Sequence, residues 1–242
     1  MLLDVLPRLR AMRLVLASGS PRRIEMLRGA GLDFLEVIPS CFAETLEKAA
    51  FASAASYALA TARGKADEVL ARLEAAEAAE AASSRAGAEA DAAALAPPRA
   101  PLVVIACDTV VEAPNGEVLE KPRDRADAAR MLRLLSGTPH RVHSGVVLLG
   151  RGRAVLESFT QTTVVQFAAL PESLVLAHSA SDEDLDKAGA YAIQGRAASF
   201  VARVDGDASS VIGLPLQRVC AALRALALAP APSLAPAIAP AL

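Results

Sequence analysis

The chain has 242 residues, enough for one domain or two small ones with a buried core, and a formal net charge of −2 at pH 7. This charge balance, with only 3% aromatic residues, argues against the basic surface and stacking platform that nucleic-acid binding requires. The longest uncharged stretch, 225–242, carries four prolines that would break a spanning helix, so we expect no membrane association and a disordered tail over 229–242.

The cysteines indicate a reducing compartment. Cys41, Cys107 and Cys220 are odd in number, far apart and without a CxxC pair, which disfavours both a disulfide framework and a structural zinc site. Residues 1–13 form an N-terminal extension that is too short and too interrupted for a cleavable presequence. We therefore expect a cytoplasmic protein.

The first predicted strand and helix enclose an anion site. Residues 14–23 read as an apolar strand, a loop of small residues and a helix start, with Ser20 as N-cap and Pro21 as the first helical residue. The free backbone donors of such a loop lie at the positive end of a helix, beside Arg22 and Arg23. Phosphate is the anion that such a loop would bind. The glycine spacing matches neither GxGxxG nor the P-loop, so the pattern indicates neither a dinucleotide-binding fold nor a P-loop ATPase.

The predicted helix continues through apolar positions three residues apart and stops at Gly31. A strand-like run over 34–39 follows, then a loop with Glu44 and a long alanine-rich helix that carries Lys65. Residues 74–101 are rich in Ala, Glu and Ser without apolar periodicity, and we interpret them as an insertion that prolongs the helix by a few turns and then forms a flexible loop.

Polar residues follow the next predicted strands. A buried strand over 102–106 is expected to end just before Asp108 and Thr109, and a turn at 115–116 leads to Lys121 and a helix with its apolar face at positions 128–135. Further strands are predicted over 144–149 and 157–167, a polar helix over 181–186, and Gln194 after a later strand. Alternating strands and helices predict the α/β class.

Ligands of open α/β sheets bind at strand ends, so these polar residues are expected to converge. Lys65 and Lys121 would supply cations, and Glu44, Asp108 and Asp186 would supply carboxylates. This combination suits a magnesium-bound polyphosphate, because Mg²⁺ prefers carboxylate and phosphate oxygens together with water.

Six sequence blocks, read in order, resemble the Maf family of nucleoside triphosphate pyrophosphatases over residues 14 to about 217. They are LVLASGSPRRIEMLRGAG, the pair Glu44 and Lys65, ACDTVVEAPNGEVLEKPRD, LSGTPHRVHSGV, DKAGAYAIQG and VIGLPL. The resemblance implies a Maf/ITPase-like elongated mixed β-sheet flanked by helices, in a domain over 14–228, with hydrolysis between the α- and β-phosphates. It also implies a divalent cation, Mg²⁺ or Mn²⁺, and leaves a homodimer open.

The resemblance also implies individual roles. Asp108 would be the general base, acting with Glu44, Lys65 and Lys121, while Glu44 and Asp108 would hold the metal. Phosphate-binding positions fall on Ser18 and Arg23.

Substrate choice is implied by three further positions. Arg22, Thr109 and Gln194 resemble the residues that mark the branch acting on dTTP and UTP. The alternatives are a 7-methyl-GTP pyrophosphatase, which differs at these positions, and a catalytically idle nucleotide-binding regulator of cell division, which the retained Asp108, Lys65 and Lys121 disfavour.

Overall fold

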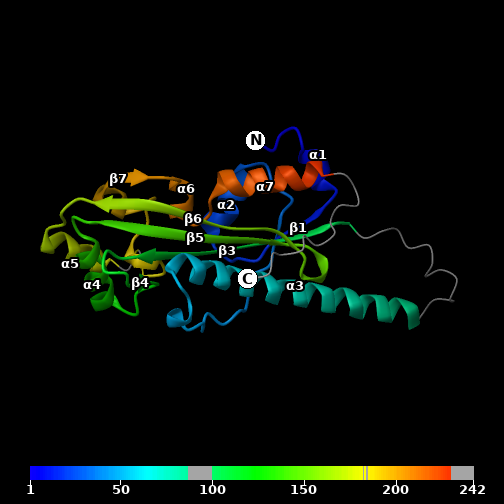
Figure 1. The fold of residues 1–242 in the computed structure, drawn as a ribbon, viewed down its shortest axis with the longest axis horizontal. Helices are drawn as coiled ribbons and strands as arrows, with labels where there is room; N and C mark the ends of the chain where they lie inside the picture. Colours follow the sequence, from blue (N-terminus) through cyan, green and yellow to red (C-terminus); the bar gives the residue numbers. More distant parts are fainter. Residues whose placement is uncertain (87–99, 182, 184, 230–242) are drawn as a thin grey trace.

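The computed structural model describes residues 1–86, 100–181, 183 and 185–229. One seven-stranded mixed sheet with flanking helices gives the molecule an elongated shape (Figure 1), which confirms the predicted α/β class. The strands are β1 (Arg13–Leu16), β2 (Glu36–Val37), β3 (Leu102–Glu112), β4 (Val118–Leu119), β5 (Pro139–Leu149), β6 (Val155–Phe167) and β7 (Val201–Asp205). The α-helices are α1 (Leu6–Arg10), α2 (Pro21–Gly29), α3 (Ala54–Ala86), α4 (Arg125–Leu135), α5 (Glu172–Ala180), α6 (Ala208–Ile212) and α7 (Leu216–Leu228). The 3₁₀ helices are η1 (Lys48–Ala50), η3 (Arg151–Arg153), η4 (Ala188–Ala190) and η5 (Arg196–Phe200).

The sheet order is β2-β1-β3-β5-β6-β7, with β4 paired to β3. Strand β1 runs parallel to β3 but pairs with it only as far as Ile105, and β4 pairs with it only from Val111 onward. On its other side β3 pairs with β5 along 104–112. In the middle of β3, residues 107–109 therefore have a neighbouring strand on one side only, and we call this stretch the open edge of β3.

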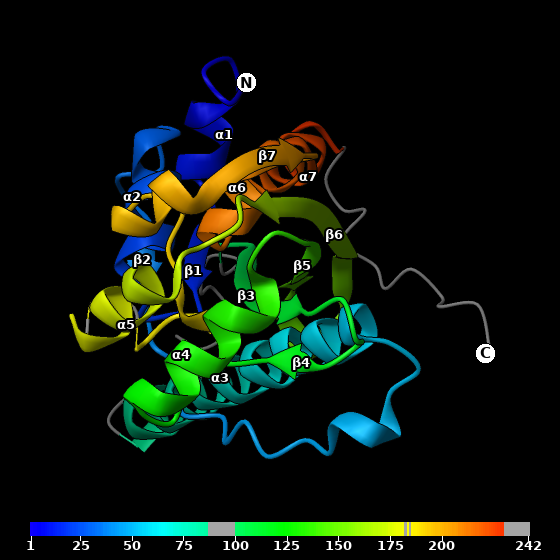
Figure 2. The same ribbon diagram turned by 90° about the vertical axis from the view of Figure 1, so that its left-hand side faces the viewer.

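Helices cover both faces of the sheet (Figure 2). Alternate residues of β3 point to opposite faces. Val104 and Ala106 pack in the core formed with α3, whereas Ile105 and Cys107 pack in the core formed with α2 and α7. The same alternation continues into the polar residues that follow.

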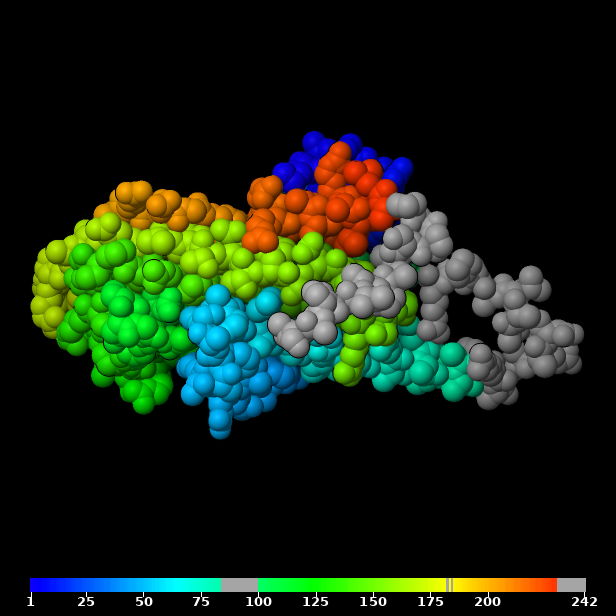
Figure 3. All heavy atoms as spheres, in the orientation of Figure 1, coloured from blue at the N-terminus to red at the C-terminus, as the bar shows by residue number. Residues whose placement is uncertain are grey.

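The N-terminal residues form part of the core that contains α2 and α7. Leu2, Val5 and Leu9 are buried beside α7, and Asp4 forms an ion pair with Arg224. Figure 3 shows this segment and α7 together on one side of the molecule. Burying three large apolar side chains stabilises the fold by several kcal/mol at about 1.5–3 kcal/mol each.

Helix α3 continues into the predicted insertion and ends at Ala86, which confirms the expected extension of the helix. Glu77 forms ion pairs with Arg13 and Arg151, and Glu74 accepts a hydrogen bond from the backbone of Gly152. These contacts fasten the extended helix to the start of β1 and to η3. The predicted flexible loop falls on 87–99 and the predicted tail on 230–242, outside the described residues.

The helix expected over 181–186 is wrong for the described residues of that stretch, 181, 183, 185 and 186, which form turns. The structure forms α5 over Glu172–Ala180 instead, with Val175 buried against the core that includes α4. The charged stretch after it has no apolar stripe to bury, so it cannot gain the packing energy that stabilises a short helix. None of the helices in the described part of the chain combines the length and apolar character needed to span a bilayer.

Candidate active site at the open edge of β3

Asp108 and Thr109 lie inside β3, where they pair with Gly145 and Ser144 of β5. The expectation that the strand ends before them is wrong. Two polar residues interrupt its apolar pattern, but β5 pairs with β3 across the interruption and keeps the backbone extended. Being adjacent in a strand, the two side chains point to opposite faces of the sheet at its open edge.

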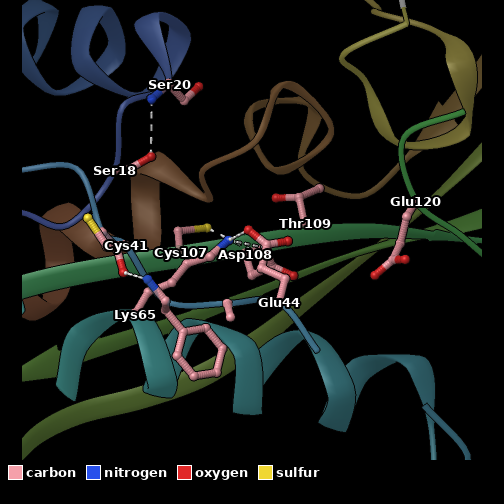
Figure 4. Close-up of polar contacts among 12 residues, drawn as sticks. Ser18, Ser20, Cys41, Glu44, Lys65, Cys107, Asp108, Thr109 and Glu120 are labelled. Carbon is pink, nitrogen blue, oxygen red and sulfur yellow. Dashed lines mark hydrogen bonds and ion pairs between the residues drawn. The ribbon is translucent and has the colours of Figure 1, made fainter. Parts of the chain in front are cut away.

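Lys65 joins two carboxylates on the α3 face (Figure 4). Its Nζ lies 2.7 Å from Asp108 Oδ1 and 2.8 Å from Glu44 Oε1. The side chains of Lys65 and Asp108 are 12% and 10% exposed, whereas that of Glu44 is 48% exposed. The structure thus brings together three of the predicted site residues from a helix, a strand and a loop, with Glu44 on the solvent side.

Two glycines allow α3 to pack closely against β5 and against the loop that leads to Glu44. A Cβ on Gly145, the residue paired with Asp108, would lie 2.5 Å from the backbone nitrogen of Leu59 in α3. A Cβ on Gly64, next to Lys65, would lie 2.5 Å from the Phe42 ring in the loop that leads to Glu44. Both contacts are shorter than real Cβ contacts allow, so glycine at these positions sets where Lys65 and the Glu44 loop can lie.

A second cluster lies close to Lys65, and sequence reasoning missed it. The Tyr57 hydroxyl donates to Glu120 Oε1 at 2.7 Å, and Lys48 Nζ lies 2.6 Å from Glu120 Oε2. Burial alone would raise the pKa of Glu120, but the hydrogen bonds from Lys48 and Tyr57 outweigh it and hold the pKa below its usual value. Glu120 directly precedes Lys121 in the EKP block, which is the signal that could have identified it.

Lys121 is not brought into this cluster. It is exposed on the loop after β4 and forms no hydrogen bond or ion pair within the described part of the chain. Its catalytic role therefore stays a prediction.

The predicted phosphate loop is linked to β3 through Arg23. The Arg23 guanidinium donates to Ser18 Oγ at 3.2 Å, to Thr109 Oγ1 at 3.3 Å and to the Gly213 carbonyl at 2.8 Å. Ser20 occupies the N-cap position of α2, as predicted, but its side chain makes no capping bond. Its backbone N–H donates to Ser18 Oγ instead, so Ser18 organises the loop.

The three predicted specificity residues lie on separate elements. Arg22 is in the first turn of α2 and Thr109 is in β3. Gln194 lies in a turn after η4 and not after a strand, which corrects its predicted placement. It is exposed and forms no hydrogen bond within the described residues, and the segment 191–195 pairs with no strand there.

The donor set suits a hard divalent cation with few protein ligands. Asp108 and Glu44 each use one oxygen for Lys65, and the second oxygen of each has no hydrogen-bond partner in the described part of the chain. No group of three or more His, Cys, Asp or Glu side chains arranged for a metal occurs among the described residues. Two carboxylates fit Mg²⁺, which usually keeps several waters and takes further oxygens from substrate phosphates.

The sequence was compared with protein families and with curated proteins. A family model described as "Maf-like protein" matches residues 13–226. The chain is 39% identical over 218 residues to a "dTTP/UTP pyrophosphatase" of Exiguobacterium sibiricum, covering 90% of this chain and 94% of that protein. It is 42% identical over 204 residues to a protein of the same name from Vibrio cholerae, covering 84% and 92%.

A human relative is named "Probable bifunctional dTTP/UTP pyrophosphatase/methyltransferase protein". It is 40% identical over 237 residues, which cover 96% of this chain and 35% of the human protein. The chain thus spans about a third of that relative and nearly all of the two bacterial ones. With the family model matching most of its length, the chain belongs to the Maf family.

Proposed function

We propose that the chain hydrolyses dTTP and UTP between the α- and β-phosphates and releases the monophosphate and pyrophosphate. The two bacterial relatives bear the name of this activity, and the chain spans nearly their whole length. The structural observation that carries the proposal is the cluster of Lys65, Asp108 and Glu44 at the open edge of β3. There a carboxylate that can accept a proton lies beside a fixed cation, where no strand blocks access.

In the proposed reaction, water adds to the α-phosphorus and the bond to the oxygen bridging to the β-phosphate breaks. Asp108 accepts the proton of the attacking water, and its bond to Lys65 holds the carboxylate in place. The charge that grows on the departing pyrophosphate needs cations, which Lys65 and the exposed Lys121 can provide.

A divalent cation, Mg²⁺ or Mn²⁺, completes the proposed site. Glu44 and Asp108 are the residues that would hold it, since each has a carboxylate oxygen without a hydrogen-bond partner in the described residues. When bound, the ion would polarise the phosphoryl oxygens. The loop of Ser18 and Arg23 would receive phosphate oxygens on the other side of β3.

The nucleobase of the substrate is proposed to lie near Arg22, Thr109 and Gln194. A uracil or thymine ring offers two carbonyl acceptors and one N–H donor, and these three side chains can satisfy such a set. We also propose that the enzyme acts on free nucleotides and not on nucleic acid, because the net charge is −2 and aromatic residues are scarce.

The test is a panel of nucleotides assayed with Mg²⁺, with Mn²⁺ and with chelator, in an assay that separates pyrophosphate from orthophosphate. We expect pyrophosphate from dTTP and UTP only with metal, and far less from dATP, dGTP or 7-methyl-GTP. Orthophosphate as the first product, or activity that survives chelation, would contradict the proposed chemistry. A preference for 7-methyl-GTP would contradict the proposed substrate.

A further inference from the structure

A buried chain of hydrogen bonds runs from the phosphate loop through the sheet to α6. Arg23 Nη2 lies 3.3 Å from Thr109 Oγ1, Thr109 Oγ1 lies 2.8 Å from Ser144 Oγ, and Ser144 Oγ lies 2.9 Å from the carbonyl oxygen of Ser210. Ser144 and Ser210 have no exposed surface, whereas Thr109 is partly exposed at the open edge of β3. Arg23 and Thr109 therefore form the accessible part of this hydrogen-bond chain, and Ser144 and Ser210 form its buried part.

The chemistry of its two ends, the Arg23 guanidinium and the Ser210 carbonyl, gives this hydrogen-bond chain a direction. A carbonyl oxygen can only accept, so the Ser144 hydroxyl must donate to Ser210 and can only accept from Thr109. A guanidinium can only donate, so Thr109 accepts from Arg23. Each hydroxyl has one proton and two lone pairs, and Thr109 thus has its proton and one lone pair engaged within the protein.

The competing acceptor for the Thr109 proton is the Gly213 carbonyl, 3.3 Å away. That oxygen already accepts from Arg23 Nε at 2.8 Å and lies 3.1 Å from Cys107 Sγ. Because these two nearer donors already occupy the two lone pairs of the Gly213 oxygen, this carbonyl is a weaker acceptor for the Thr109 proton than Ser144 is. Ser144 is the group that holds the Thr109 proton.

We infer that Ser144 is a positioning residue for base selection, because it turns the Thr109 hydroxyl so that only a lone pair faces the substrate. This inference rests on the proposed function, in which Thr109 adjoins the base. Uracil and thymine carry an N3–H that can donate to such a lone pair, whereas N3 of cytosine is an acceptor and would face another acceptor. Ser144 thereby favours uracil and thymine nucleotides over cytosine nucleotides without touching either.

The experiment compares kcat/KM for UTP and CTP in the wild-type chain and three variants, with each variant checked for folding by thermal denaturation. Ser144→Ala removes the acceptor and frees the Thr109 proton, so we expect the UTP/CTP ratio to fall about tenfold, mainly through faster CTP hydrolysis. Thr109→Val removes the lone pair, and we expect kcat/KM for UTP to fall about tenfold without a matching loss for CTP.

Ser210→Ala is the matched control. Its hydroxyl is as buried as that of Ser144 but bonds Thr163 and Asp207, and its carbonyl, which Ser144 uses, stays in place. An unchanged UTP/CTP ratio in Ser144→Ala, or the same change in Ser210→Ala, would overturn the inference while the proposed function stands. Absence of pyrophosphate from every nucleotide with the wild-type chain would overturn the proposed function, and the inference with it.

Discussion

At the scale of residues, Asp108 is the position where a role in accepting a proton can be tested separately from a structural role. Asparagine has almost the same shape and its carbonyl can still accept the hydrogen bond from Lys65, but it cannot take a proton from water. We expect Asp108→Asn to lower turnover at least ~10²-fold while nucleotide binding, measured by calorimetry, is largely kept. The control is Asp205→Asn on the exposed β7, which should be neutral. Near-normal turnover of Asp108→Asn would show that Asp108 is not the base.

The candidate site was predictable from the sequence to differing degrees. Glu44, Lys65 and Asp108 meet as expected, because each belongs to a block of recognisable order. The contact between Tyr57 and Glu120 joins residues 63 positions apart, so the EKP block could point to Glu120 but not to its partner. The directed hydrogen bond from Ser144 likewise depends on strand register, which periodicity alone leaves open.

At the scale of elements, the fit of α3 on β5 decides where Lys65 lies. Gly145→Ala would place a Cβ against the α3 backbone, so the helix must shift from the sheet and carry Lys65 away from Asp108. We expect a loss of about 1–3 kcal/mol in the free energy of unfolding, measured with denaturant, and a lower kcat. Gly29→Ala, at a helix position with nothing within 4 Å, is the control and should not destabilise. Equal effects of the two changes would refute this account of α3.

The extended part of α3 allows a second prediction. Replacing 87–99 by a Gly/Ser linker of equal length should change Tm and turnover little, because the sequence of this segment is rich in Ala and has no apolar periodicity. Glu77→Ala should instead destabilise by roughly 1–3 kcal/mol, since Glu77 is 14% exposed and holds both Arg13 and Arg151. Thermal denaturation of both variants distinguishes the two segments. A large loss on linker replacement would mean that 87–99 packs on the domain.

Where the sequence carries a clear apolar stripe, the element type followed from periodicity, whereas element ends did not. The helices over 21–29 and 125–135 show apolar stripes at helical spacing, and the structure has both. Strand β3 extends past its apolar run because β5 pairs with it, which is a tertiary effect. The burial of Leu2, Val5 and Leu9 against α7 is likewise set by a partner more than 200 residues away.

At the scale of the whole molecule, the end far from β1 is held by a core that contains a buried histidine. His140 is 2% exposed, its Nε2 lies 2.9 Å from the Tyr191 hydroxyl, and its ring packs edge-on against Phe167. Burial lowers the pKa of His140 from 6.5 to about 4. The folded chain therefore keeps this imidazole neutral at pH values where the unfolded chain has already protonated it.

This difference predicts how stability depends on pH. Above pH 6.5 both states are neutral at His140, so its contribution is fully present there, and it is lost as pH falls from about 6.5 to about 4. The shift corresponds to a loss of about 3 kcal/mol in the free energy of unfolding, at roughly 1.4 kcal/mol per pKa unit. Denaturant titrations across this range should show the loss in the wild-type chain and a smaller one in His140→Phe, which keeps a ring but cannot titrate. The carboxylates titrate in both chains, so the difference between the two curves isolates His140. Parallel curves, or a His140 pKa near 6.5 by NMR, would show that this core does not resist protonation.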